Sequence, residues 1–191
     1  MINKVLSVLK DQLNGPGGLK DILGEITVVD NISKQDGENQ GIEDKVVITL
    51  VNVEEESTLK NSSRYITPPT LNEIKMESNP AYLNLYVMIS ANRTTYNNAL
   101  ANISKVIEVF QANNILTYHY PGNDPSNDFS FRIELHTVPF EQLSYIWGLL
   151  GGKIMPSVLY KISIVKIVAN DPTSVKLIKD VNVKDIQVNQ L

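Results

Sequence analysis

The sequence predicts a single α+β domain with a mixed, mostly antiparallel sheet, one long and two short helices, and an extended C-terminal arm. Three observations predict it: a run of apolar and β-branched residues at 45–53, an alternating segment at 80–91, and helical spacing of large apolar residues from 96 to 110. With 191 residues, of which 42% are hydrophobic and 20% charged, the chain can bury a core without disulfides. We place the domain at residues 1–172 and the arm at residues 173–191.

The first two predicted elements are a short amphipathic helix and a strand. Residues 1–14 place apolar side chains at helical spacing, and the sequence Asn-Gly-Pro-Gly-Gly at 14–18 cannot continue a helix. The run at 26–32 is apolar and rich in β-branched residues, and a polar loop follows it up to Gly41. The apolar stripe of the helix consists of Ile2, Val5, Leu6, Leu9 and Leu13.

The segment 45–53 is predicted as a central strand, because nearly every residue in it is apolar or β-branched, as in strands covered on both faces. Glu54, Glu55 and Glu56 are expected to end it. Residues 57–79 are polar, contain two adjacent prolines and show no sustained period. We interpret them as a long excursion, since loops of this length in compact domains are usually functional or disordered.

A second strong strand and the longest helix follow. In the segment 80–91 the odd positions are all apolar, whereas the even positions include tyrosine, asparagine, methionine and serine. The odd face therefore belongs to the core, and the even face is either packed under a helix or offered to a neighbouring molecule. Thr94 or Thr95 can cap the next helix. The predicted buried stripe of that helix is Tyr96, Leu100, Ile103, Ile107 and Phe110.

The C-terminal half continues the sheet. Residues 129–135 alternate between apolar and polar side chains, which predicts a half-exposed strand. Pro139 can begin a short helix that ends at the glycine pair 151–152, and residues 158–168 form another strand. Trp147 lies at helical spacing with two leucines and is expected in the core, although tryptophan is also enriched at binding hot spots.

The last nineteen residues carry apolar side chains along an otherwise polar segment. This pattern has strand propensity but offers little surface to pack inside its own domain. Two interpretations remain open: the segment adds an edge strand to the same sheet, or it is an arm that pairs with an exposed edge in a neighbouring protein. The apolar residues include Val175, Leu177, Val181, Val183, Ile186 and Val188.

Charge is concentrated in one part of the chain. The net charge is −4, but residues 30–56 hold eight acids and two lysines, which gives this stretch −6 and the remainder +2. The acidity argues against a broad nucleic-acid surface, which needs many lysines and arginines. The acidic stretch suits a basic protein partner, while a solvated face is the more ordinary interpretation.

Composition excludes several classes of chemistry. The chain has no cysteine and only two histidines, His119 and His136, so disulfides and thiol catalysis are ruled out and a zinc site would need carboxylates. The apolar N-terminal run is too short for a signal peptide, and no segment approaches the length of a membrane span. We therefore expect synthesis in the cytoplasm without an export signal, no nucleic-acid partner and no direct membrane insertion.

The sequence also lacks a motif for catalysis or cofactor binding. The glycine-rich segments at 15–18 and 148–153 do not have the spacing of phosphate-binding loops and are interpreted as helix-ending turns. Neither histidine has a local acid or serine that predicts a triad. We predict no catalytic residue, no metal ligand and no cofactor. The runner-up interpretation is a small-ligand-binding or enzymatic domain with a site around Tyr82, Tyr86 and His136.

Four segments, taken in order, carry a family resemblance. They are residues 48–56 with 59–61, residues 80–91, the helix from Tyr96 to Gln111, and residues 147–153 with Pro156, Ser157 and Tyr160. Through them the chain resembles the cap or tail-terminator proteins of phage-tail-like contractile injection systems, the family typified by the antifeeding prophage and the virulence-cassette particles. The likeness covers roughly residues 1–168.

The resemblance implies a non-enzymatic structural part. Such a protein closes the end of the inner tube distal to the baseplate and engages the last ring of the contractile sheath. It acts as a homohexameric ring, so the implied partners are further copies of itself, the inner tube protein and the sheath protein. The implied location after synthesis is an injection particle of a kind that can be released outside the cell. A baseplate or tube–sheath adaptor of the same machine is the alternative within this class.

The predicted interface residues lie in three places. The acidic run is expected to meet a basic patch on the tube or on the adjacent subunit, where charge sets register more than affinity. The excursion is expected to order against the tube or a neighbour, and the arm to extend a sheath sheet by β-augmentation. The predicted residues are Glu54, Glu55, Glu56, Asn61, Arg64, Val181, Val183, Ile186 and Val188.

Overall fold

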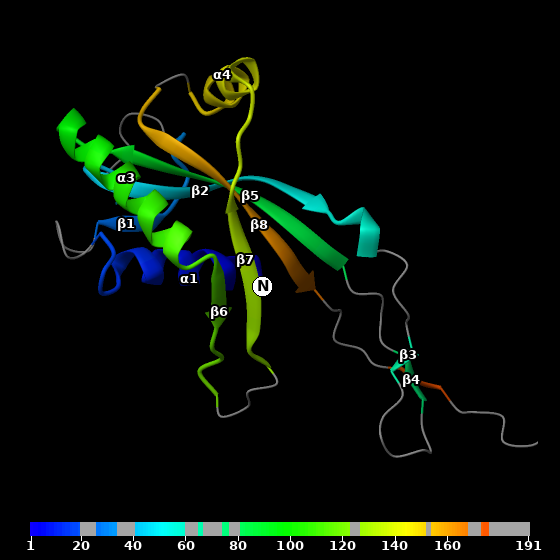
Figure 1. Ribbon diagram of the computed structural model, residues 1–191. Helices are drawn as coiled ribbons and strands as arrows, with labels where there is room; N and C mark the ends of the chain where they lie inside the picture. The colour runs from blue at the N-terminus through cyan, green and yellow to red at the C-terminus, as the bar shows by residue number, and fades with distance from the viewer. Residues whose placement is uncertain are drawn as a thin grey trace, which may run out of the picture.

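A mixed six-stranded sheet lies at the centre of the computed structural model (Figure 1). Its spatial order is β1-β2-β5-β8-β7-β6, with β1 parallel to β2 and the other neighbouring pairs antiparallel, which confirms the predicted mixed sheet. The bounds are β1 Thr27–Val29, β2 Lys45–Glu55, β5 Ala81–Asn92, β6 Ile115–Tyr118, β7 Phe129–Leu135 and β8 Ser157–Ile167. The structure describes residues 1–19, 26–33, 41–59, 65–66, 74–76, 81–122, 127–151, 154–167 and 173–175.

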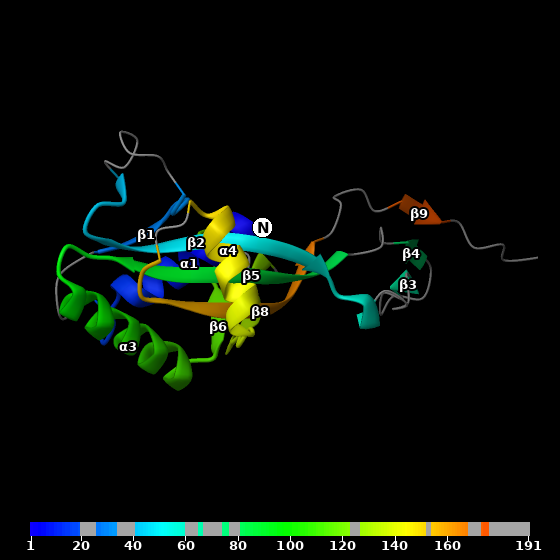
Figure 2. The same cartoon turned by 90° about the horizontal axis from the view of Figure 1, so that it is seen from above.

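Within the described residues, three α-helices cover the two faces of this sheet (Figures 1 and 2). They are α1 Ile2–Asn14, α3 Tyr96–Ala112 and α4 Phe140–Leu149, which confirms one long and two short helices. Buried residues of α1 and α3 share one core with the odd-numbered residues of β5, so both helices pack on the same face. α4 packs on the opposite face. The fold is therefore of the α+β class, with helices on both sides of the sheet.

The stripe predicted for α1 is confirmed. Four of its five residues are buried, and Ile2 packs against the same core. The helix ends at Asn14, whose side chain exchanges two hydrogen bonds of 3.1 Å with the backbone N–H and carbonyl of Thr27. These bonds attach the end of α1 to the first residue of β1. Gly17 follows with a φ of +74°, a conformation that glycine adopts without strain.

The face under α4 is also closed. Trp147 is 3% exposed and packs with Met88 and Leu159, so its expected place in the core is confirmed. Met88 and Ser90, on the even face of β5, are fully buried. Of the two interpretations of that face, packing within the chain is therefore correct for this part of the strand. Pro139 stands at the N-cap of α4, as predicted.

The stripe predicted for α3 is partly wrong. Tyr96 is 66% exposed, and Leu100 and Ile107 are also exposed, whereas Phe110 is 2% exposed and belongs to the core, and Ile103 packs against that core. The buried face is shifted by about one residue, which is roughly 100° around the helix. Smaller residues face the sheet because they let the helix approach it closely, and a choice by side-chain size overlooks them. The buried residues are Ala99, Asn102, Val106, Val109 and Phe110.

β2 is longer and less covered than the sequence predicts. The sequence predicts that the three glutamates follow the strand, whereas Glu54 and Glu55 are its last two residues. Coverage on both faces holds for residues 46–48, which are fully buried, while residues 52–55 are exposed. β5 explains the extension, because residues 83–86 continue the ladder opposite these residues. The hydrogen bonds of that ladder outweigh the low strand propensity of glutamate.

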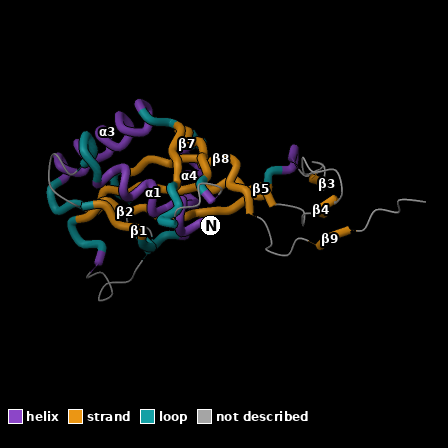
Figure 3. Tube along the Cα trace, turned by 90° about the horizontal axis from the view of Figure 1, so that it is seen from below, coloured by secondary structure: helices purple, strands orange, loops and turns teal. Residues whose placement is uncertain are grey.

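Three short strands form a second sheet in the order β3-β4-β9. β3 Tyr65–Ile66 and β4 Ile74–Met76 belong to the predicted excursion, and β9 Thr173–Val175 to the predicted arm. β9 is antiparallel to β4, so the start of the arm pairs within its own chain but not as an edge strand of the main sheet. Figure 3 shows this small sheet beyond the ends of β5 and β8. Residues 176–191 lie outside the described part, and the boundary after residue 172 stays a prediction.

The shifted face of α3 gives a testable contrast between two aromatic residues of one helix. Replacing Phe110 with alanine should lower the free energy of unfolding by about 3–5 kcal/mol, because it opens a cavity in the core. Replacing the exposed Tyr96 with alanine should change it by less than about 0.5 kcal/mol. Urea denaturation of both variants measures the two values, and equal losses would contradict the assigned buried face.

Candidate interaction surface

The three predicted glutamates lie at one end of the β2–β5 pair, and Figure 2 shows both strands continuing past α4 toward this end. We call Glu54, Glu55 and Glu56 the acidic end. The register of β2 on β5 is irregular between Leu50 and Asn52, where β2 carries an extra residue. Beyond this bulge Glu54 stands opposite Asn84, on the face that α4 covers farther along the strand.

Glu56 is held firmly by its own chain. Its Oε1 accepts hydrogen bonds from the hydroxyl and the backbone N–H of Thr58, at 2.6 and 3.2 Å, and its Oε2 accepts one from Asn84 Nδ2 at 2.8 Å. These bonds and the charge of Lys161 lower the pKa of the Glu56 carboxyl to about 2. The hydrogen bond from the Thr58 hydroxyl has the largest effect, the bond from Asn84 the next largest, and the charge of Lys161 the smallest. Glu56 thus ties the 3-10 turn η2, Ser57–Leu59, to β5.

Glu54 and Glu55 are exposed and point to opposite faces of the sheet. Asn52 Nδ2 donates a hydrogen bond to Glu54 Oε1 at 3.1 Å. Burial raises the pKa of the Tyr86 phenol, and its hydrogen bond to Glu54 and the charges of Glu54 and Glu56 act in the same direction. The expectation that Glu54 and Glu56 share a side is confirmed by these common neighbours. Glu54 and Glu55 are therefore the more exposed acids of the acidic end, and their place at an interface stays a prediction.

The residues of the runner-up interpretation come together only in part. The rings of Tyr86 and His136 lie edge to face with centroids 5.0 Å apart, while Tyr82 contributes its carbonyl, which accepts a 2.7 Å hydrogen bond from the backbone N–H of Glu56. In the described part of the chain, no cluster of acidic residues and histidines is placed to hold a metal ion.

His119 has an acidic partner, Asp128, that its local sequence does not reveal. Its Nδ1 lies 2.8 Å from Asp128 Oδ2, and Asp128 Oδ1 accepts a 2.7 Å hydrogen bond from the backbone N–H of Tyr120. The β6–β7 hairpin brings these residues together, and their separation in sequence hid the pair. The imidazole is exposed, and among the described residues no serine hydroxyl hydrogen-bonds to it, so no triad forms.

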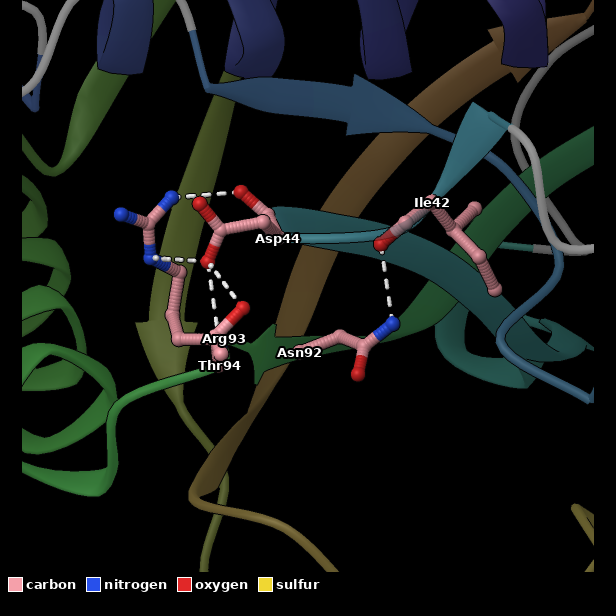
Figure 4. A network of polar contacts seen from close by, with 5 residues as sticks. All are labelled: Ile42, Asp44, Asn92, Arg93 and Thr94. Atoms are coloured by element: carbon pink, nitrogen blue, oxygen red, sulfur yellow. Dashed lines mark hydrogen bonds and ion pairs between the residues drawn. The ribbon is translucent and has the colours of Figure 1, made fainter.

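The opposite end of the β2–β5 pair is locked by a polar network (Figure 4). Asp44 Oδ1 accepts hydrogen bonds from the backbone N–H and hydroxyl of Thr94, at 3.0 and 3.3 Å, and lies 3.5 Å from Arg93 Nε. The Thr94 N–H contributes most to lowering the pKa of Asp44. Arg93 also donates to the Asp44 carbonyl, and Asn92 Nδ2 donates to the Ile42 carbonyl at 2.9 Å. This acid therefore serves the fold, because it joins the start of β2 to the end of β5.

Two groups of large apolar side chains are exposed. The α3 patch, Tyr96, Leu100 and Ile107, and the α4 patch, Tyr145 and Leu149, lie on helices that pack on opposite faces of the sheet. Phe140 is also exposed, but helix geometry places it on another side of α4. Neither patch was predicted, because helical spacing assigns large apolar residues to the core. Neighbouring exposed apolar residues of this size are typical of protein contact surfaces.

A family model described as the Pvc16 N-terminal domain matches residues 4–179. The chain belongs to the Pvc16 N-terminal domain family. The match includes every strand and helix described above apart from the first two residues of α1. The comparison of this Pvc16-family chain with curated proteins found no match.

Two solved structures share the fold of this Pvc16-family chain. The sheath/tube terminator of PVC, an extracellular contractile injection system, in its extended state, has a TM-score of 0.63 and 15% identity, with coverage of 100% of this chain and 65% of that chain. The tube-terminating cap of the anti-feeding prophage has a TM-score of 0.61 and 13% identity, with coverage of 97% and 61%. The chain thus spans less than two thirds of the length of either protein.

Of the predicted interface residues, only the acidic end falls within the described part of the Pvc16-family chain. Asn61, Arg64, Val181, Val183, Ile186 and Val188 lie outside it. Their place at an interface stays a prediction. Each described helix is too short or too polar to cross a membrane.

The hydrogen bonds of Glu56 predict a pH-dependent loss of stability. Because its folded-state pKa of about 2 is below the ordinary 4.5, the ionised carboxylate stabilises the fold above pH 4.5, and this contribution is lost as the pH falls through 2. The Glu56→Gln variant lacks this term, so its deficit relative to the unsubstituted chain should shrink from pH 7 toward pH 2. Denaturation midpoints across this range measure it.

Asn84 supplies the matched control for this measurement. The Asn84→Ala variant retains Glu56 but loses one hydrogen-bond donor to it, so the pKa of Glu56 should rise. When Glu56→Gln is added to this variant, the further loss of stability, and its dependence on pH, should be smaller than in the unsubstituted chain. A deficit that is constant from pH 7 to pH 2 would contradict the role of these bonds.

Proposed function

We propose that the chain is a structural cap of a contractile injection particle, which closes the end of the inner tube distal to the baseplate and engages the last ring of the sheath. The observation that carries the proposal is the family match over residues 4–179. The fold shared with a PVC sheath/tube terminator and an anti-feeding prophage cap supports it. The particle is of a kind released from the cell in which it is made.

The surface of the chain supports assembly into a homohexameric ring. A ring is built from head-to-tail contacts, so each subunit needs two different patches that complement each other. The α3 patch and the α4 patch are two such apolar surfaces, and they belong to helices on opposite faces of the sheet. Burial of both patches between neighbouring copies would remove large apolar side chains from water.

The proposed action is mechanical, and it is not enzymatic. A terminator occupies the growing end of the tube with a surface that offers no site for another tube subunit. It also couples the sheath to the tube, so that contraction acts on a closed structure. The charges of Glu54 and Glu55 are suited to set the register of such contacts, because exposed charges steer association more than they add affinity.

Native mass and location test the ring. Light scattering of the purified chain should give six times 21.3 kDa, or about 128 kDa, and negative-stain images should show closed rings. If the chain is monomeric alone, adding inner tube and sheath should produce the ring on the tube end. Failure to bind either would overturn the cap assignment. A position at the baseplate would instead identify an adaptor.

Charge reversal tests the acidic end. The Glu55→Lys variant should assemble with its partner about tenfold more weakly at low salt, because it replaces attraction to a basic patch with repulsion. The control is Glu43→Lys, which reverses an exposed acid just before β2, at the other end of that strand. The difference should vanish near 1 M salt, where the screening length is about 3 Å. Equal assembly of both variants at low salt would contradict the predicted contact.

A further inference from the structure

Strand β1 covers only the beginning of the outer edge of β2. It pairs with residues 46–48, and the chain then turns away from the sheet. Thr49 fixes the point at which the chain leaves the sheet, because its hydroxyl donates a hydrogen bond to the Asp30 carbonyl at 2.8 Å and accepts one from the backbone N–H of Ile32 at 3.2 Å. Among the described residues, no strand pairs with this edge from Leu50 to Glu55. Figure 2 shows this part of β2 at the rim of the sheet.

A cleft of about 490 Å³ lies where β1 leaves β2. Apolar side chains from β1, β2 and the end of α4 line much of it, and Val29 and Leu149 among them are exposed. A strand edge beside an apolar cleft is a template for β-augmentation: backbone hydrogen bonds give affinity, and alternate side chains of the added strand fill the cleft. The residues that line it from these three elements include Val29, Leu50, Val51, Ile146, Leu149 and Leu150.

The charges at this edge favour a basic strand. Asp30 lines the cleft, and Glu54 and Glu55 follow along the same edge. Because Glu54 and Glu55 point to opposite faces of the sheet, a lysine on either face of an added strand meets a carboxylate. The occupant therefore needs alternating aliphatic residues together with lysines.

The segment that follows β9 has this chemistry. Residues 176–191 include three lysines and two aspartates, which leaves one excess positive charge, and Val181 and Val183 alternate as an added strand requires. These sixteen residues can extend over roughly 50 Å, whereas the edge from Leu50 to Glu55 needs about 20 Å. The segment is therefore long enough to leave its own copy and lie along the edge of another. The lysines are Lys176, Lys179 and Lys184.

We propose that residues 176–188 of one copy add a strand to the outer edge of β2 in a second copy. The contact is heterologous, since each copy donates one segment and accepts another, and it therefore suits a closed ring. The inference rests on the proposed ring and names a contact that links its subunits. Pairing of the segment with its own β2, or with a sheath subunit instead, is an outcome of the test.

The absence of cysteine from the chain allows a clean crosslinking test. Two full-length variants, Val53→Cys and Val183→Cys, are co-expressed, oxidised gently and separated under denaturing conditions. A disulfide between copies requires Cα atoms within about 7 Å, so a covalent dimer reports this contact. The matched control replaces Val53→Cys with Tyr120→Cys, just after β6 at the opposite edge of the sheet and outside both apolar patches, since the two residues are 39% and 42% exposed. Val181→Cys repeats the test at a second position of the segment.

The expected result is a covalent dimer with Val53→Cys at roughly ten times the control yield, because the paired strands hold the two thiols at high effective concentration. A yield equal to the control at both valines overturns the inference, and a ring of native mass in the same preparation leaves the proposed function standing. The inference is also overturned if a chain that carries both cysteines forms the disulfide only within one copy. It is overturned as well if the segment crosslinks only to an added sheath protein.

Discussion

The rest of the structure depends on the burial of β5 between helices that cover its two faces to different extents. β5 has twelve residues and spans about 40 Å, whereas α4 crosses the strands in Figure 2 and covers them over the width of one helix, about 10–12 Å. α4 therefore covers less than half of β5. Under it Met88 of β5 and Leu159 of β8 pack against Trp147 of the helix, and beyond it the same sheet face carries Asn84 and Tyr86. The acidic end thus occupies a part of the β2–β5 pair that α4 does not cover.

The main strands and helices can be predicted from the sequence, because their patterns are long and regular. β5 alternates over its whole length, and the stripe of α1 is unambiguous. β6 is not predictable in the same way, since its four residues carry too few periods and pair only through the hairpin with β7. The buried face of α3 was misplaced because Ala99 and Val106, rather than Tyr96 and Leu100, face the sheet.

The candidate surface was predictable only in outline. Alternation along a strand correctly places Glu54 and Glu56 on one side, but it does not reveal that Asn84 and Thr58 bind Glu56. Such partners come from the pairing of distant segments, which local patterns do not encode. The same holds for His119 and Asp128, which meet only when the hairpin closes. The exposed patches of α3 and α4 were hidden for a different reason, since a helix that assembles with other molecules has apolar residues on more than one face.

The irregular register at Val51 has a consequence for the recognition surface. Because one extra residue reverses the inside–outside order of everything after it, the orientation of the carboxylates depends on a residue count. A regular ladder through Val51, with no bulge and no residue removed, would place Glu54 opposite Leu83 and turn the Glu54 and Glu56 side chains to the face of α1 and α3, with the same acids still present. Deletion of Val51 would instead straighten the strand and leave Glu54 opposite Asn84. The bulge, more than acidity, therefore decides which face of such a domain is negatively charged. Two relatives with β2 strands of equal length and charge, one with the bulge and one without it, would present opposite surfaces to their partners.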